Sequence, residues 1–484
     1  MPPSSTPVPT PVPTPSPAPA LPQLTELPPD IKAIVHGVSL LGGWLPLTVE
    51  LVSVVALALM LARLGRRWWL VWVPVSAALG VAVALAARTY MNSEGLASDP
   101  APLDLWIWTA LAAAAIPLAV FGWRRSQWWR RVVSLLLIPL TALTALMSLN
   151  RWVGYYPTVQ AAWGAVTAGP LPHQVEAAEL PSLRGTAPTD GKLVEVTIPD
   201  TVGFKHRSEY VYLPPAWFAG PTPPALPVVM MIAGEFNTPA DWMRSGNAMA
   251  TIDGFASAHA GMAPIFVFVD SGGRFNNDTE CVNGPRGNSA DHLTKDVRPY
   301  VVSKFGASAS PANWGVVGWS MGGTCAIDLT VMHPELFSTF EDIAGDHGPT
   351  AGTKEQTIER LYAGDADRWA AFDPATVMRK HGPYQGVSGW FADTIKPDLG
   401  DKNPFGKFHA PQRDSDTPLG FGGHDDWHDA DQTGAAQDLC AVAKSVNIDC
   451  AIHTLVSFHT WQFAQRAFSD ALPWMAGQLH TPAK

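Results

Sequence analysis

A serine lies between closely spaced glycines in the segment VVGWSMGGTCA, residues 316–326. The five residues Gly318 to Gly322 read G-W-S-M-G, the G-x-S-x-G pattern of a nucleophile elbow, in which a tight turn between a strand and a helix exposes the serine hydroxyl. Glycines are needed because a side chain two positions before or after the serine would clash in so tight a turn. A serine held in this way attacks carbonyl carbons, so the pattern indicates acyl-transfer chemistry at Ser320.

A serine hydroxyl is a poor nucleophile at neutral pH and needs a base. In folds with this elbow the catalytic residues follow the order serine, acid, histidine along the chain. His459 follows the last strand pattern, within SFHTWQF (457–463), and is the predicted base. His453 lies inside that strand and His480 lies near the chain end, so we expect both to have structural or surface roles.

The acid of the triad should follow the preceding strand. That strand pattern ends in GWFAD, at Asp393, and we predict Asp393 as the acid. A long stretch, 394–430, follows that a minimal fold of this kind would not contain. It leaves other aspartates open as the acid, namely Asp398, Asp425, Asp426 and Asp429.

Two backbone N–H groups are expected to stabilise the oxyanion. One belongs to Met321, at the start of the helix after the serine, where the helix dipole adds to the stabilisation. The other comes from the loop after the third strand, IAGEFN (232–237), where Gly234 permits close backbone approach. Its candidate donor is the N–H of Glu235 or that of Phe236.

Two polar segments contain side chains of the kinds that bind metals. HDDWHD (424–429) has imidazole and carboxylate groups, which suit zinc or manganese, but their spacing follows no metal-site pattern. FNNDTE (275–280) offers oxygen ligands but lacks a complete calcium-binding loop. We therefore predict neither a metal site nor a cofactor.

Strand and helix patterns alternate after residue 190, and these elements must position the candidate residues. The third, fourth and fifth strand patterns are continuously apolar, which is typical of strands covered on both faces. The alternation predicts an α/β-hydrolase domain, with a mostly parallel sheet and helices on both faces. The predicted strands are 192–199, 208–215, 225–234, 263–270, 313–320, 337–345, 386–393 and 449–457, and the predicted helices are 240–258, 290–304, 322–333, 433–446 and 461–479.

An apolar region precedes this domain. Four of its segments approach the about 20 residues that a helix needs to cross a bilayer, so we predict a four-helix transmembrane domain. Glu50 interrupts the first span, and we expect it to face another helix or a cavity. The predicted spans are 40–62, 68–87, 105–123 and 132–149. The predicted organisation is a Pro-rich tail at 1–33, the membrane domain at 34–152, a connecting segment at 153–190 and the hydrolase domain at 191–484.

The loops between the spans predict the orientation of the chain. Arginines cluster between spans one and two and between spans three and four, whereas the loop 88–104 carries three acidic residues against one arginine. Because positively charged loops remain in the cytoplasm, the N-terminus, the loop 88–104 and the hydrolase domain are expected outside a plasma membrane. The net charge is −10 and no basic patch indicates a nucleic-acid partner.

The four cysteines all follow the last span. An even number in an exported domain favours two disulfides. Four cysteines allow three pairings, and the short separation of Cys440 and Cys450 favours that pair, which leaves Cys281 with Cys325.

Three motifs resemble one group of α/β-hydrolases: GWSMGGT (318–324), GNSADHLTKDVRPYV (287–301) and FHTWQF (458–463). This group includes esterase-D-like enzymes and the secreted mycolyltransferases of mycobacteria, and the resemblance covers roughly residues 190–480. The order of four spans and then this domain resembles membrane-anchored esterases of actinobacteria. The resemblance implies that Ser320 attacks an ester carbonyl, that His459 transfers the proton and that an aspartate near Asp393 orients the imidazole.

The sequence departs from the mycolyltransferases in two places. They use a glutamate as the triad acid and an Asp-Gly-Leu-like oxyanion loop, whereas this chain has an aspartate candidate and reads Ala233-Gly234-Glu235. From this resemblance we therefore infer only serine ester chemistry.

These features predict a membrane-anchored serine esterase or acyltransferase that acts outside the membrane through an acyl-enzyme. The expected partners are the bilayer and an ester substrate, a lipid or an acylated glycan of the cell envelope. One span would suffice as an anchor, so four are also compatible with an oligomer, a lipid site or a substrate conduit. The alternative is a catalytically inactive hydrolase-fold binding module on a membrane scaffold.

Overall fold

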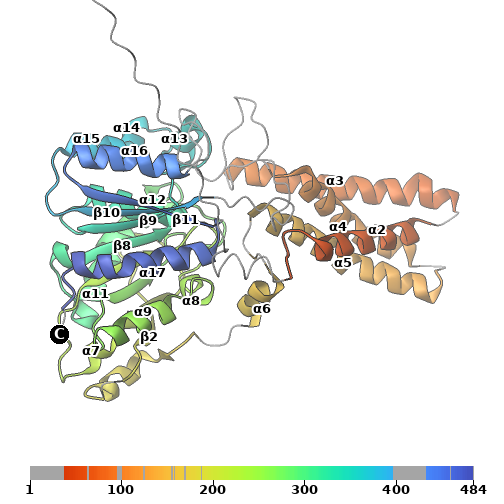
Figure 1. Cartoon of the computed structure of the whole chain (residues 1–484). Coiled ribbons are helices and arrows are strands. Elements are labelled where there is room, and N and C mark those ends of the chain that lie inside the picture. The colour runs from red at the N-terminus through yellow and green to blue at the C-terminus, as the bar shows by residue number, and fades with distance from the viewer. Residues whose placement is uncertain are drawn as a thin grey trace, which may run out of the picture.

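The chain forms a bundle of apolar helices and a larger α/β part (Figure 1). The computed structural model describes residues 38–62, 65–94, 101–123, 126–153, 156, 158–167, 171–186, 188–395, 432–457 and 459–482. Several predicted sites lie outside the described residues, namely Asp398, Asp425, Asp426, Asp429 and the whole segment 424–429.

Four helices are long and apolar enough to cross a membrane, as the sequence predicted. Their order follows from their contacts, because α4 packs against α3 and α5, and α2 packs against α5. Figure 1 shows them side by side, apart from the sheet. They are α2 (Trp44–Leu61), the π-helical turn η1 (Trp68–Trp72) continued by α3 (Val73–Glu94), α4 (Leu103–Gly122) and α5 (Trp128–Val153).

Charged side chains inside the bundle contact one another. Glu50 Oε1 on α2 lies 2.7 Å from Arg151 Nη2 on α5, and Arg151 Nη1 lies 3.8 Å from Asp104 Oδ2 on α4. The expectation that Glu50 faces another helix is confirmed. The pairing reduces the cost of placing a carboxylate in an apolar bundle.

A nine-stranded sheet forms the centre of the α/β part, in the order β1-β2-β3-β5-β4-β8-β9-β10-β11. β3 is antiparallel to both of its neighbours, and every other pair is parallel. All eight predicted strands are confirmed, and β1 (Gln174–Val175) adds a short edge strand. The others are β2 (Lys192–Val196), β3 (Glu209–Leu213), β4 (Val228–Ile232), β5 (Ile265–Val269), β8 (Trp314–Trp319), β9 (Thr339–Ile343), β10 (Ser388–Ile395) and β11 (Asp449–Val456).

Alternate side chains of each central strand enter two separate cores, because successive residues of a strand point to opposite faces. Val228 and Met230 belong to the core under α11, α12 and α16, and Val229 and Met231 belong to the core under α9 and α17. Helices therefore cover both faces, and the predicted α/β-hydrolase architecture is confirmed. These helices are α9 (Ala248–Ala258), α11 (Arg298–Phe305), α12 (Met321–Met332), α16 (Gln432–Ser445) and α17 (Trp461–Gln478).

The predicted helices correspond to the observed ones, with two refinements. Segment 240–258 divides into α8 (Asp241–Arg244) and α9, and segment 290–304 begins with α10 (Ser289–Asp291) and the π-helical η3 (His292–Val297) before α11. Three helices after β9 were not predicted, although Thr353 and Gln356 form the capping box that opens the first of them. They are α13 (Lys354–Tyr362), α14 (Ala366–Ala370) and α15 (Pro374–His381).

Both predicted disulfides are present. Cys440 at α16 pairs with Cys450 in β11, with 5.9 Å between the Cα atoms. Cys281 pairs with Cys325 on α12, with 5.6 Å between the Cα atoms. The second bond ties the loop after β5 to the helix that follows Ser320.

Short elements join the bundle to the sheet. α6 (Val159–Thr167) follows α5, and the 3₁₀ helix η2 (Ala177–Leu183) precedes β2. The two parts also touch directly, because Asn276 Nδ2, in the loop after β5, donates a hydrogen bond to the Tyr90 hydroxyl on α3 over 2.5 Å.

Candidate active site

Ser320 occupies a strained turn between β8 and α12. Its backbone has φ 59° and ψ −122°, a conformation that side-chain-bearing residues rarely adopt and that costs about 1–3 kcal/mol. The flanking glycines are sterically required. A Cβ on Gly318 would lie 1.6 Å from the carbonyl oxygen of Gly322, and one on Gly322 would lie 2.3 Å from that of Ile232. The elbow geometry indicated by the motif is therefore present.

His459 lies beside the serine. It follows β11 and precedes α17, and its Nε2 is 3.2 Å from Ser320 Oγ, across 139 positions of sequence. The imidazole also stacks on the indole of Trp319, with 4.1 Å between the ring centroids. The structure thus brings the predicted nucleophile and base within hydrogen-bonding distance.

Asp393 belongs to β10, which lies between β9 and β11 in the sheet. It is 2% exposed, and its Oδ1 accepts the N–H of Thr394 at 2.9 Å. β8 and β10 are parallel to the strand between them, so Ser320 and Asp393 lie toward the same carboxyl edge of the sheet. This edge is also where β11 delivers His459.

The two predicted oxyanion donors lie at the start of α12 and in the loop after β4. A Cβ on Gly234 would lie 3.1 Å from Ser320 Cβ, so the loop after β4 packs directly against the nucleophile. Glu235 and Met321 line the same small pocket. Within the described part of the chain, the backbone N–H groups of both residues have no hydrogen-bond acceptor and are available to an oxyanion.

An ion pair that the sequence did not predict holds the oxyanion loop. Arg207 Nη2 lies 2.6 Å from Asp270 Oδ1 and donates a second hydrogen bond to the carbonyl of Asn237 over 2.8 Å. Asp270 directly follows β5 and is buried. The guanidinium therefore fixes the loop after β4 to the end of the neighbouring strand, a long-range contact for which the sequence offers no local signal.

Comparison with known proteins places this site in a family. Residues 205–472, more than half of the chain, match the family described as Putative esterase. The chain belongs to the Putative esterase family. It is 31% identical over 309 residues to an uncharacterized protein of Corynebacterium glutamicum, which covers 60% of this chain and 70% of that relative.

Solved structures that resemble this chain include two hydrolases and MPT51 (FbpC1). An S-formylglutathione hydrolase from Agrobacterium tumefaciens is 16% identical with a TM-score of 0.45, and covers 60% of this chain and 97% of its own. A fluorophosphonate-binding serine hydrolase of Staphylococcus aureus is 14% identical with a TM-score of 0.42. The match covers 59% of this chain and 98% of that chain. MPT51 (FbpC1) of Mycobacterium tuberculosis is 16% identical with a TM-score of 0.38. The match covers 59% of this chain and 97% of that chain.

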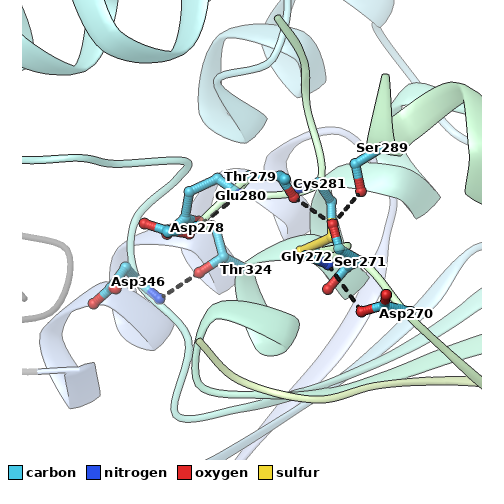
Figure 2. The surroundings of a disulfide bond; sticks show 11 residues. Asp270, Ser271, Gly272, Asp278, Thr279, Glu280, Cys281, Ser289, Thr324 and Asp346 are labelled. Carbon is cyan, nitrogen blue, oxygen red and sulfur yellow. Dashed lines mark hydrogen bonds between the residues drawn. A yellow bond between two sulfur atoms is a disulfide. The ribbon is translucent and has the colours of Figure 1, made fainter. Parts of the chain in front are cut away.

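The chain carries a group of acidic side chains near Ser320 that the sequence did not predict as a site. Asp278 and Glu280, from the loop after β5, are each 5% exposed. Figure 2 shows them beside the disulfide, on the side where Asp346 lies. Burial raises the pKa of Glu280 well above its ordinary value, and the negative charges of Asp278 and Asp346 raise it further.

A second group of titratable side chains has the spacing of a metal site. Ligand atoms of His206, Glu209 and His292 lie within 4.8 Å of one another. Hydrogen-bond partners account for the ring nitrogens, however. The ring nitrogens of His206 lie 2.8 Å from the carbonyl oxygen of Ile198 and 3.0 Å from that of Arg207. The ring nitrogens of His292 lie 3.1 Å from Glu209 Oε1 and 3.3 Å from Asp296 Oδ2. We interpret the group as a buried ion network that joins β3 to η3.

Proposed function

We propose that this protein is a membrane-anchored serine ester hydrolase or acyltransferase whose site lies outside the membrane. The observation that carries the proposal is the 3.2 Å distance between Ser320 Oγ and His459 Nε2 at a strained elbow, in a chain of the Putative esterase family. We assign the nucleophile to Ser320, the base to His459 and the acid to Asp393.

The chemistry proceeds in two halves. Ser320 Oγ bonds to the ester carbonyl carbon while His459 Nε2 takes the hydroxyl proton, and the N–H groups of Met321 and Glu235 stabilise the oxyanion. The bond from the carbonyl carbon to the alcohol oxygen then breaks, and His459 protonates the departing alcohol. A water or an acceptor hydroxyl then adds to the acyl carbon and gives its proton to His459. The bond from that carbon to Ser320 Oγ breaks, His459 returns the proton to Oγ, and the acid or a new ester is released.

Apolar groups near the site support a substrate from the membrane or the cell envelope. Phe275 is 68% exposed and contacts Phe236 of the oxyanion loop, with 5.4 Å between ring centroids. The next residue, Asn276, bonds Tyr90 on α3. On α6, Trp163 is 68% exposed. Exposed aromatic residues next to membrane-spanning helices are typical of the bilayer interface.

Charge and redox arguments support the external placement. The positively charged loops are expected to remain in the cytoplasm. The C-terminal ends of the second and fourth spans, and the hydrolase domain after them, are then outside. Both cysteine pairs form disulfides, which persist in oxidising compartments. We propose the same division of the chain as before: a tail at 1–33, a membrane domain at 34–152, a connecting segment at 153–190 and an external hydrolase domain at 191–484.

A fluorophosphonate probe tests the proposal, because it reacts with activated serine nucleophiles. We expect the full-length protein in detergent to be labelled at Ser320, and the Ser320→Ala variant to remain unlabelled and to lose ester hydrolysis. A panel of acetyl, butyryl and long-chain esters, with and without a sugar acceptor, then separates hydrolysis from transfer. A folded protein that is not labelled at Ser320 would overturn the proposal and favour the inactive binding module.

A further inference from the structure

Four carboxylates gather around the first turns of the nucleophile helix, and we call Glu235, Asp278, Glu280 and Asp346 the acidic cage. Glu235 follows Gly234, which packs against Ser320. Asp346 donates its backbone N–H to Thr324 Oγ1, one turn beyond the serine, over 2.9 Å. The disulfide of Cys281 attaches Glu280 to the same helix (Figure 2).

Among the described residues, the four acidic side chains of the cage have one neighbouring cation, Arg286. Burial raises the pKa of Glu235, and the charge of Asp278 raises it further. Burial also raises the pKa of Asp346, as do neighbouring carboxylates. Arg286 is the cation that acts on Glu235 and Asp278, and its Nη1 is 3.7 Å from Asp278 Oδ2. Among the described residues, the charges that act on Glu280 and Asp346 are all negative.

Two carboxylate oxygens of the cage lack hydrogen-bond partners. Glu280 is 5% exposed, and its Oε2 has no partner among the described residues, nor has Glu235 Oε1. Leaving such atoms buried and unsatisfied is unfavourable, so they indicate a missing donor. Glu235 and Asp346 are partly exposed, and Glu235 lines the small pocket that also contains Met321.

The backbone that carries the cage is also strained. Glu280 and Cys281 both have left-handed conformations, with φ 49° and 51°. Two such neighbouring residues without a glycine are unfavourable, and strain of this kind concentrates at ligand-binding sites. The Cys281–Cys325 disulfide holds the strained segment in place.

The chemistry of the cage favours an ammonium ligand. A metal ion requires converging ligand atoms, and the group of described residues that has them within 4.8 Å lies elsewhere, at His206, Glu209 and His292. A sugar hydroxyl is neutral and offers a single O–H donor, so it satisfies acidic side chains less fully than a cation does. An ammonium group brings one positive charge and up to three N–H donors, and tolerates acceptors that are spread apart.

We propose that the protein acts on esters that carry a protonated amine, and that the acidic cage binds this ammonium beside the scissile carbonyl. The amine belongs to either the acyl or the alcohol part of the ester. This inference rests on the proposed serine ester chemistry at Ser320.

Two substrate pairs that differ in one amino group test the inference. Ethyl L-alaninate and ethyl propionate differ in an acyl-side amine, and 2-(dimethylamino)ethyl acetate and 3-methylbutyl acetate differ in an alcohol-side amine. We expect kcat/KM of one charged ester to exceed that of its neutral partner by about tenfold or more, since hydrogen bonds to charged groups have that strength. The pair that shows the preference identifies the side that carries the amine.

Variants assign the preference to the cage. Glu280→Gln and Glu235→Gln are each expected to lower the ratio of charged to neutral kcat/KM about tenfold. Glu341→Gln is the matched control, because Glu341 on β9 is a buried glutamate with two unpartnered oxygens and its charge neighbours are Asp342 and Asp470 rather than the cage. Its ratio should equal that of the parent protein. A competition assay needs no variant: L-alaninamide should inhibit turnover of a neutral ester and propionamide should not.

The outcomes separate this inference from the proposed function. Ratios near one for both pairs, with Ser320 still labelled and neutral esters still hydrolysed, would overturn the ammonium site alone. A high ratio that neither Glu280→Gln nor Glu235→Gln reduces would also overturn it. A folded protein without labelling at Ser320 would instead contradict the serine chemistry itself.

Discussion

The indole ring of Trp319 stacks on the imidazole of His459, with 4.1 Å between the centroids and 29° between the planes. Trp319 is the residue before the nucleophile and is 4% exposed, so its ring is held by the core. The stack limits rotation of the imidazole and keeps Nε2 directed at Ser320 Oγ. Trp319 is thus a positioning residue that joins the elbow to the loop after the last strand.

Replacing this ring should loosen the imidazole without removing it. We expect Trp319→Leu to lower kcat about tenfold with little change in KM, because misplacing a base by a fraction of an ångström affects the chemical step more than substrate binding. Trp319→Phe keeps a flat ring and should restore most of the loss. Steady-state kinetics on a neutral ester measure both effects, and an equal kcat for Leu and Phe variants would contradict the positioning role.

The serine and histidine should act as one unit. Ser320→Ala and His459→Ala are each expected to lower kcat by about 10⁴-fold or more, and the double variant should be no slower than either single variant. Near-additive losses would show that the two side chains act independently. Thermal unfolding of each variant serves as the control for folding.

Substitutions of two buried aspartates on adjacent strands, Asp393 and Asp342, test which residue is the triad acid. Asp393→Asn should lower kcat/KM by about 10³-fold, because an amide cannot stabilise the imidazolium as a carboxylate does. Asp342→Asn is the matched control on β9, with an expected loss of less than about tenfold. Its carboxylate accepts the Gly345 N–H at 2.8 Å, which is a structural contact. Full activity of Asp393→Asn would indicate that the triad acid is instead one of the aspartates in 394–430, namely Asp398, Asp425, Asp426 or Asp429.

Stability should decrease as the pH rises from the ordinary pKa of an aspartate towards neutrality. Burial raises the pKa of Asp342 from 3.8 to about 7, and the charge of Asp393 adds to the shift. The folded protein therefore holds this proton more tightly than the unfolded chain, so the associated stability is complete below pH 4 and is lost progressively up to pH 7. Between pH 5 and pH 8 the loss from Asp342 is about 2–3 kcal/mol.

Thermal unfolding in detergent, followed by tryptophan fluorescence, measures this dependence. The midpoint should be higher at pH 5.5 than at pH 8, and Asp342→Asn should reduce the difference. A midpoint that rises with pH in the parent protein would show that carboxylates with lowered pKa values dominate instead.

Much of the fold could be predicted from sequence because its signals are local. The spans are apolar over the length of a bilayer, and the central strands are continuously apolar because both faces are covered. The elbow at Ser320 was predictable for the same reason: Gly318 and Gly322 are required by steric contacts within a few residues or with the adjacent strand. Chain order then identified His459, which follows the last strand.

The helices after β9 show where local signals were missed. The capping box of Thr353 and Gln356 is a sequence pattern, and reading it would have predicted α13. The aspartates of 394–430 are a different case, since many polar residues follow one strand and spacing alone cannot select an acid among them.

Sequence by itself therefore determined the layered α/β architecture, predicted Ser320 and His459 as nucleophile and base, and favoured the disulfide pairs that the structure contains. Each of these depends on patterns within short segments or on their order. Only the tertiary structure decided the Arg207–Asp270 bridge, the Trp319–His459 stack and the acidic cage. These groups join loops that are far apart in the chain, and their meeting depends on strand order and register, which fix which strand ends lie side by side. Folding places these carboxyl groups beside Ser320, and their burial and mutual proximity raise their pKa values.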